Sequence, residues 1–368
     1  MLRQYKLKNY NFKLVLFVFA LSVLGYMVIG SAKQSVQDRQ MYGIVVGVIV
    51  MILVSLVNYS VFYHIRWLIY GANIVLLLLV LFIGNEVNGS KRWLNLGFQF
   101  QPSELAKILL ILFFAQFIMK NKNNLNSVSV LVAALLLLAA PLLLIYKEPD
   151  LSTTIMIILS FTVMLFVGGL SYKIVFTILG ISIPAFVLFF SIILRDDNNF
   201  LEGYQVNRIL AFLDPEKYAD TYAYQQINSR IAISSGQLLG KGLNNNVISS
   251  VKNGDFISEP QTDFIYAIVG EELGFIGAAS VIILIILIVI ECLRIARYAK
   301  DDMGALICSG IAGLISLQAF MNIAVATASM PNTGIPLPFV SYGLTSLVSL
   351  YMGIGVVLNV GLQTTKTH

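Results

Sequence analysis

The chain has 368 residues, of which 58% are hydrophobic and only 12% are charged, and its net charge is +5. Soluble domains carry about 25% charged residues, so this composition excludes an ordinary water-soluble domain and indicates a membrane protein. The modest net charge gives no indication of nucleic-acid binding. Two cysteines and two histidines, without metal-ligand spacing, argue against zinc or redox chemistry.

Long apolar runs are the main feature of the chain. A membrane-spanning helix needs about 20 predominantly apolar residues. We predict ten such helices, at 13–31, 41–58, 65–84, 103–119, 128–146, 151–169, 173–194, 264–296, 304–329 and 341–362. The predicted fold class is therefore an all-α polytopic membrane protein with a single domain over 1–368. Because the run at 264–296 is long for one crossing, we expect it to tilt or to extend into the cytoplasm.

Lysine and arginine residues in short loops predict the orientation, since such residues are retained on the cytoplasmic side. If both termini are placed in the cytoplasm, the cytoplasmic segments contain more Lys and Arg residues than the short outer segments do. We therefore expect a cytoplasmic tail over 1–12, a cytoplasmic C-terminus, and a large extracellular loop over 195–262 between the seventh and eighth helices. Most acidic residues then fall at the outer boundary, which places the polar chemistry on the outer face of a bacterial-type cytoplasmic membrane.

Two motifs flank the outer start of the fourth predicted helix. Lys91 and Arg92 are adjacent cations followed by Trp93, a pattern that fits either a lipid-headgroup anchor or a pyrophosphate clamp. Glu104 and Lys107 are three residues apart, so they share one helix face. They could form a structural ion pair or line a site, and the cost of charges in an apolar segment favours the site.

The extracellular loop contains one predicted helix and one predicted turn. Tyr224, Ile227, Ile231 and Leu238 keep helical spacing, which predicts an amphipathic helix lying on the membrane or on the helical bundle. The glycine-rich stretch at 236–242 does not have the spacing of a phosphate-binding loop, so a turn is the better interpretation.

Acidic residues gather where this loop enters the eighth predicted helix. Asp263 stands at the helix start, where a carboxylate often serves only as a cap. Its position at the junction of the outer loop and the membrane favours a functional role instead. Glu271 follows eight residues later, about 12 Å further along the helix. Glu272 points to the opposite side, and we expect it to pack against another helix.

The segment 331–343 contains three prolines and two glycines and therefore cannot be a continuous helix. Irregular backbone at membrane depth is tolerated only where it is buried in protein or lines a cavity. We therefore predict a re-entrant wall of a polar cleft, which includes Ser341. A plain connecting turn is the alternative.

Taken together, these motifs resemble the SEDS family of bacterial polytopic membrane proteins, which includes RodA, FtsW and SpoVE. The matching segments lie in the expected order at 91–94, 101–107, 149–153, 203–209, 212–215, 262–265, 270–274 and 334–343. Two details depart from the family pattern: the lead into the Thr-Asp-Phe motif, and Leu344 after Ser-Tyr-Gly. These departures weaken any assignment to elongation, division or sporulation.

The resemblance implies a peptidoglycan glycosyltransferase that polymerises lipid II into β-1,4 glycan strands and releases undecaprenyl diphosphate. It also implies a class B penicillin-binding transpeptidase as a partner. By the same resemblance, the essential acidic residue of the family falls on Asp263. No cofactor is required by the sequence, although Mg²⁺ or Mn²⁺ is compatible with carboxylates and a diphosphate.

The expected mechanism assigns a role to each candidate residue. We expect Asp263 to accept the proton of the acceptor hydroxyl group as that oxygen attacks the donor sugar. The remaining candidates form the predicted substrate-binding set: Lys91, Arg92, Glu104, Lys107, Arg208, Glu271 and Ser341. The four cations would bind the diphosphate, and Glu104 would position Lys107 or hold a sugar. A lipid II flippase and a non-catalytic scaffold are the alternatives. The lack of an internal repeat and the polar motifs on one face argue against a transporter.

Overall fold

The computed structural model describes residues 9–87, 90–95, 97, 99–178, 180–181, 184, 203–244, 250, 254 and 256–364. Within these ranges, eight helices are long and apolar enough to cross a membrane, and a ninth, α7, is a shorter apolar helix. They are α1 (Phe12–Ala32), α2 (Gln37–Leu56), α4 (Arg66–Ile83), α5 (Pro102–Lys120), α6 (Val128–Lys147), α7 (Leu151–Val167), α11 (Ile265–Arg297), α12 (Asp302–Ala326) and α13 (Leu344–Leu362). The protein is a multi-pass membrane protein.

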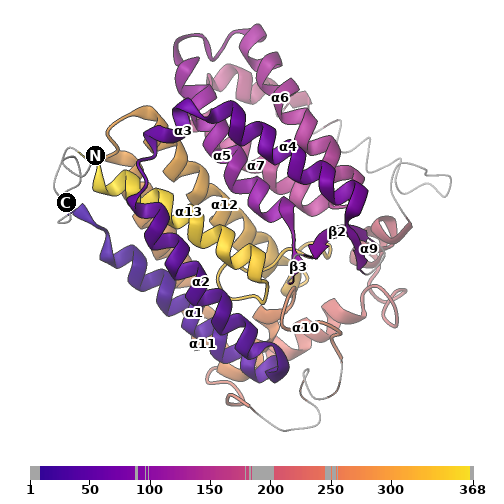
Figure 1. Ribbon diagram of the computed structural model, residues 1–368. Coiled ribbons are helices and arrows are strands. Elements are labelled where there is room, and N and C mark those ends of the chain that lie inside the picture. Colours follow the sequence, from indigo (N-terminus) through magenta and orange to yellow (C-terminus); the bar gives the residue numbers. More distant parts are fainter. Residues whose placement is uncertain are drawn as a thin grey trace.

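These nine helices correspond to nine of the predicted apolar runs. Most of the seventh predicted run, 173–194, lies outside the described residues, as do 195–202 and short stretches of the predicted loop, so the count of ten stays a prediction. The two ends of the described chain meet, because the Asn9 side-chain amide donates to the carbonyl and hydroxyl oxygens of Thr364 at 3.4 and 3.2 Å. The termini therefore lie on the same side of the bundle, as expected (Figure 1). Which side faces the cytoplasm stays a prediction.

Helices α5, α12 and α13 form the centre of the bundle, where most of their side chains are buried. Helices α4 and α6 lie at its edge and expose large apolar side chains such as Leu68, Phe82 and Leu136. Exposed apolar surface of this extent would cause a soluble protein to aggregate, whereas acyl chains solvate it. The arrangement therefore fits a bundle surrounded by lipid.

Short elements join the long helices: η3 (Gln34–Val36), α3 (Ser60–His64), η4 (Lys122–Asn124), α9 (Gly203–Leu213) and α10 (Tyr224–Ser235). The predicted all-α fold class is confirmed, with one small exception between α4 and α5. There β1 (Asn85–Val87), β2 (Ser90–Asn95) and β3 (Gln99–Phe100) form a three-stranded antiparallel sheet in the order β1-β2-β3. In this short connection, strand pairing satisfies backbone groups that no helix could.

Helix α11 is broken, which corrects the prediction of one long tilted helix. Gly274 has φ 64° and ψ −161°, a conformation that interrupts the helix. The glycine-rich turn at 236–242 fills the break: Lys241 and Gly242 donate backbone N–H groups to the carbonyls of residues 271 and 272, and the N–H group of Phe275 donates to the carbonyl of Gln237. The turn thus provides hydrogen-bond partners for the interrupted ends, as a non-helical backbone requires.

The predicted amphipathic helix is α10, and it packs with its polar side inward. Gln226 donates to the carbonyls of Val325 and Met330 at 3.1 and 2.8 Å, and the Ser229 hydroxyl group donates to the carbonyl of Ala326 at 2.7 Å. These contacts satisfy carbonyls at the C-terminal end of α12. Ile231, by contrast, is exposed, so the apolar stripe does not face the bundle. Of the two predicted surroundings, the structure shows the helical bundle, with the apolar stripe turned outward.

The break in α11 leads to a stability prediction. A Cβ atom on Gly274 would stand 2.3 Å from the backbone nitrogen of Gly240, and φ is unfavourable for other residues. We expect Gly274→Ala to cost about 2 kcal/mol or more and to lower the thermal midpoint in detergent. Gly71→Ala in α4 is the control, because a Cβ atom there meets nothing within 4 Å. That control should be neutral or stabilising by up to about 1 kcal/mol; equal midpoints for the two variants would contradict the account.

Candidate active site

The segment 331–343 between α12 and α13 is irregular, and none of its residues is exposed, as expected for irregular backbone that is buried in protein. Its role as the re-entrant wall of a polar cleft stays a prediction. It packs so closely on α1 that a Cβ atom on Gly25 would stand 2.7 Å from the Cα atom of Val340. Side chains of neighbouring helices bind its carbonyl groups. The donors are Gln318 to Pro336 at 3.0 Å, Asn322 to Ile335 at 2.7 Å, Gln40 to Ser341 at 3.4 Å, and the Ser152 hydroxyl group to Thr333.

The wall is fastened to the residues that precede α11. The Ser341 hydroxyl group donates to the carbonyl of Thr262 at 2.6 Å and accepts the N–H group of Leu337 at 2.7 Å. The N–H group of Tyr342 donates to the carbonyl of Gln261 at 2.9 Å. These bonds fix the backbone of residues 261 and 262, immediately before Asp263.

Asp263 is half-buried and does not act as the helix cap that its sequence position suggests. The N-cap residue of α11 is Phe264, and no side chain caps this helix. Instead, the carboxylate faces the wall, because its Oδ2 atom lies 3.4 Å from the point where a Cβ atom on Gly334 would stand. The Arg208 guanidinium nitrogen Nη1 is 4.0 Å from the same point and donates to the carbonyl of Asn332 at 3.4 Å. Asp263 and Arg208 therefore both lie close to Gly334.

The electrostatic surroundings of Asp263 are mixed. Burial raises the pKa of its carboxyl group to about 6, and the negative charge of Glu259 acts in the same direction. The positive charges of Arg208 and Arg92 oppose this rise in pKa. At neutral pH the group is therefore mainly a carboxylate, yet it is a stronger base than an ordinary aspartate.

Arg92 links the sheet to the junction between α6 and α7. Its Nε atom donates to the carbonyl of Glu148 at 3.1 Å, and its Nη2 atom donates to the carbonyl of Pro149. Its charge also acts on Asp263, so Arg92 combines a structural contact with an electrostatic effect on the site. Lys91, the preceding residue on β2, is exposed.

Glu148 is a residue of this region that sequence reasoning missed. Its side chain is 0% exposed, and both carboxylate oxygens make no hydrogen bond within the described part of the chain. The pKa of Glu148 is raised to about 8, chiefly by burial. The negative charge of Asp150 contributes to this rise, and the positive charge of Arg92 opposes it. The signal in the sequence was two acidic residues beside a proline between two helices, but the pattern does not reveal complete burial.

Asp150 holds the starts of α5 and α7 together. Its Oδ1 atom accepts the N–H group of Thr153 at 3.1 Å and so caps α7. Its Oδ2 atom accepts the hydroxyl group of Thr153 at 2.9 Å, the amide of Gln101 at 3.3 Å and the hydroxyl group of Ser103 at 3.4 Å. Two of the motifs quoted from the sequence, at 101–107 and 149–153, thus form one structural joint.

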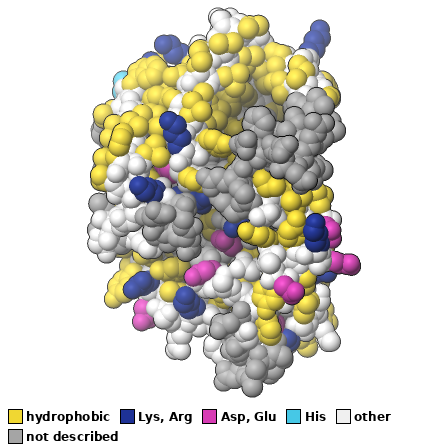
Figure 2. Space-filling view, turned by 90° about the vertical axis from the view of Figure 1, so that its right-hand side faces the viewer, with side chains coloured by type: hydrophobic (Ala, Val, Ile, Leu, Met, Phe, Trp, Pro, Cys, Tyr) yellow, Lys and Arg dark blue, Asp and Glu magenta, His cyan; other side chains and the backbone are white. Residues whose placement is uncertain are grey.

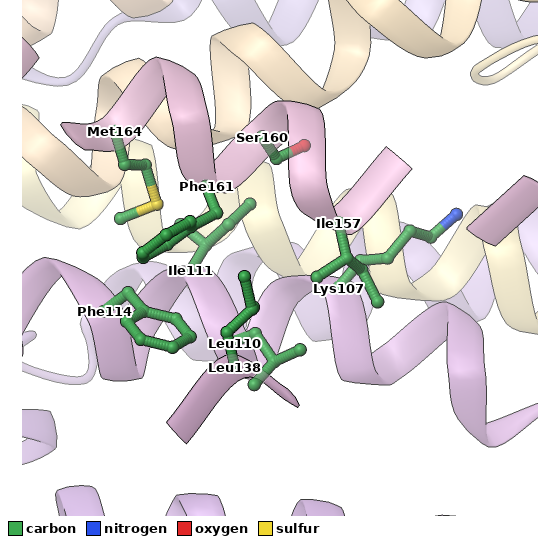
Figure 3. Close-up of a pocket in the computed structure, with 9 residues that line it drawn as sticks. All are labelled: Lys107, Leu110, Ile111, Phe114, Leu138, Ile157, Ser160, Phe161 and Met164. Carbon is green, nitrogen blue, oxygen red and sulfur yellow. The ribbon is translucent and has the colours of Figure 1, made fainter. Parts of the chain in front are cut away.

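Glu104 and Lys107 form an ion pair with a 2.8 Å separation, and both side chains are about 95% buried. The Lys107 stem lines an apolar crevice between α5, α6 and α7, and its ammonium group points away from the ring of Phe114 (Figure 3). The other lining residues are Leu110, Ile111, Leu138, Ile157, Ser160, Phe161 and Met164. The charges that act on Asp263 come from Arg208, Glu259 and Arg92, not from this pair.

Glu271 and Ser341 lie at buried positions with structural contacts. Glu271 is 1% exposed and forms an ion pair with Lys241 at 2.8 Å, which fastens the turn in the α11 break. Ser341 is 5% exposed and binds backbone groups, as described above. These placements support a structural role, and substrate contact by either residue stays a prediction.

The predicted site residues thus fall into three groups. The charges of Arg208 and Arg92 act on Asp263, and Glu104 and Lys107 form a separate buried pair. Lys91 is exposed on β2, whereas Glu271 and Ser341 make buried structural contacts. Figure 2 looks onto the side that carries β2, β3, α9 and α10 in Figure 1, and it shows acidic and basic side chains interspersed on this face. Within the described residues, no group of three or more His, Cys, Asp and Glu side chains is placed to hold a metal ion.

Comparison with known proteins gives consistent results. The family model for FtsW, RodA and SpoVE, described as cell cycle protein, matches residues 7–366. The peptidoglycan glycosyltransferase MrdB of Escherichia coli K12 is 33% identical over 94% of this chain and 92% of its own length. Stage V sporulation protein E of Bacillus subtilis is 35% identical over 88% of this chain and 86% of its own length.

Solved structures of similar proteins have the same fold as this chain. A chain from a study of a peptidoglycan synthase complex, on the structural coordination of polymerization and crosslinking, superimposes with a TM-score of 0.79 at 28% identity, covering 96% of this chain and 97% of that one. The rod shape determining protein RodA of Thermus thermophilus has a TM-score of 0.70 at 27% identity, covering 97% and 98%.

The buried Glu148 carboxyl group predicts a pH-dependent stability. Its pKa is about 8 in the folded state, against an ordinary value of 4.5, so the folded state binds the proton more tightly. The resulting stabilisation is complete below about pH 4.5 and is lost as the pH rises through about 8. Glu148→Gln should remove this loss and raise the thermal midpoint at pH 8.5 by about 2–4 °C or more, with little effect at pH 5.

Glu216→Gln is the control for this measurement, because it makes the same chemical change on an exposed side chain. Its midpoint should follow that of the wild type at both pH values. A Glu148→Gln protein that is no more stable than the wild type at pH 8.5 would contradict the assignment.

Proposed function

This chain belongs to the FtsW/RodA/SpoVE family of cell cycle proteins, and from this membership we propose that it is a peptidoglycan glycosyltransferase that polymerises lipid II on the outer face of the cytoplasmic membrane. The observation that carries the proposal is the half-buried carboxylate of Asp263, which faces an irregular wall near Gly334 and is influenced by the charge of Arg208. A base next to a cation is what glycosyl transfer from a lipid-linked diphosphate requires.

The reaction is an inverting displacement. The 4-hydroxyl oxygen of the acceptor sugar attacks the anomeric carbon of the donor and forms the new β-1,4 bond. The bond from the anomeric carbon to the diphosphate oxygen breaks, and its electron pair leaves with undecaprenyl diphosphate. The hydroxyl proton passes to Asp263, whose pKa of about 6 makes it a better acceptor than an ordinary aspartate.

The departing diphosphate carries negative charge, which cations must stabilise in the transition state. Arg208 and Arg92, whose charges act on Asp263, are the cations proposed for this role, and exposed Lys91 extends the positive charge along β2. The buried Lys107 is held by Glu104 at the mouth of the apolar crevice. A Mg²⁺ or Mn²⁺ ion that arrives with the diphosphate would add charge neutralisation. Within the described residues, no cluster of His, Cys, Asp and Glu side chains is placed to hold such an ion by itself.

A class B penicillin-binding transpeptidase is the proposed partner, because a polymer of glycan strands requires cross-linking to form a wall. The similar chain from a peptidoglycan synthase complex, in which polymerization and crosslinking are coordinated, supports this partner class.

Removal of the base is the primary test. With purified protein and lipid II, Asp263→Asn should lower the polymerisation rate by at least about 100-fold, because the amide cannot accept the proton. Asp220→Asn, the same chemical change on an exposed side chain, should leave the rate unaltered. Equal polymer from wild type and Asp263→Asn at matched folding would refute the base assignment. Transport of labelled lipid II across vesicles without polymer would instead favour a flippase.

Arg208 gives a second test through the pH profile. The wild-type kcat/KM should rise with pH through about 6, as Asp263 loses its proton. Because the charge of Arg208 lowers this pKa, Arg208→Gln should move the rise to a higher pH, by about 1 unit. Arg230→Gln on the exposed side of α10 is the matched control. A profile that shifts to lower pH, or equally in both variants, would contradict the proposed arrangement.

A further inference from the structure

A buried amide on α12 connects the two parts of the candidate site. Asn322 is 1% exposed, and its Nδ2 atom donates to the carbonyl of Asp263 at 2.8 Å and to the carbonyl of Ile335 at 2.7 Å. An amide nitrogen has two hydrogens, so these two bonds use its full donor capacity. One side chain thereby joins the backbone of the carboxylate to the backbone of the wall.

From this geometry we propose that Asn322 is a positioning residue for the glycosyl transfer: it sets the place of the Asp263 carboxylate relative to the wall and to Arg208. The inference rests on the proposed function. Asn322 does not contact the reacting atoms, and it acts only through the backbone of Asp263 and the segment that carries Gly334.

The position of Asp263 in the chain explains why such a contact is needed. The residue lies before the first turn of α11, where no side chain caps the helix. Its backbone is therefore held by the contacts of the wall rather than by the helix itself. The bonds from Ser341 and Tyr342 hold residues 262 and 261. Asn322 is the side chain in the described structure that holds residue 263 directly.

The oxygen of the same amide indicates that Asn322 is present for its two N–H donors. Asn322 Oδ1 is buried and accepts no hydrogen bond within the described residues. A buried acceptor without a partner is unfavourable, and an apolar residue of similar volume would avoid it. The nitrogen contacts therefore account for an amide at this place in an apolar helix.

Gln318 provides a matched comparison on the same helix. It lies four residues earlier, on the same face as Asn322. It is also fully buried, and its oxygen likewise lacks a hydrogen-bond partner in the described chain. Its amide donates to the carbonyl of Pro336 at 3.0 Å, so it holds the wall but does not bind Asp263. A comparison of the two amides therefore distinguishes support of the wall from positioning of the Asp263 carboxylate.

The experiment compares Asn322→Leu with Gln318→Leu in the purified full chain supplied with lipid II. Both variants lose a buried donor, and their thermal midpoints should fall by similar amounts. We expect Asn322→Leu to lower kcat by about 30-fold or more, with KM within about 3-fold of the wild type. Gln318→Leu should retain kcat within about 3-fold. The rise of kcat/KM near pH 6 should move only in the Asn322 variant, because only there do the surroundings of the carboxylate change.

Equal losses of kcat in the two variants, or an unshifted pH profile in Asn322→Leu, would overturn the proposal. If Asn322→Leu does not fold, Asn322→Ser and Gln318→Ser are compared in the same way, since one hydroxyl group can serve only one of the two carbonyls. Failure of the proposed function is distinguishable, because the wild-type protein itself would then form no polymer from lipid II.

Discussion

The structure depends on one constraint: the irregular segment 331–343 is buried among helices, where its backbone groups cannot bond to one another as they would in a helix. Each unsatisfied group would be costly in this environment. Side chains of α2, α7 and α12 provide the missing donors, and Ser341 within the segment adds another contact. Two of these side chains, Asn322 and Ser341, also bind the carbonyls of residues 263 and 262, so the solution to a folding problem also fixes the place of Asp263.

Charge at the site follows from this placement. The half-buried Asp263 carboxylate lies near two arginines, one of which, Arg92, also binds backbone carbonyls at the junction of α6 and α7. That contact holds the small sheet on the bundle while it leaves the positive charge within reach of Asp263. Burial therefore raises the pKa of the Asp263 carboxyl group, whereas the two cations lower it. The balance leaves a carboxylate that is ionised near neutral pH and is still able to take up a proton.

Much of this architecture could be predicted from local patterns. Apolar runs predicted the spanning helices, and the prolines and glycines of 331–343 predicted a buried irregular wall. The break at Gly274 could not be predicted, because the apolar pattern continues across it and the turn that fills it comes from more than 30 residues earlier. The small sheet was missed because its strands are only three, six and two residues long. The burial of Glu148 was missed because it depends on packing that only the folded chain creates. Ser341 was expected at the substrate, but its hydroxyl group is engaged with backbone groups that only the folded chain brings near.

The central claim is that this framework holds Asp263 as a base with a raised pKa. The most direct measurement is an infrared titration of the carboxyl stretching bands of the full chain in lipid nanodiscs, taken as the difference between wild type and Asp263→Asn. We predict that the band assigned to Asp263 titrates near pH 6. A band that titrates at the ordinary value of 3.8 would show that the carboxylate is fully solvated, and it would contradict the account.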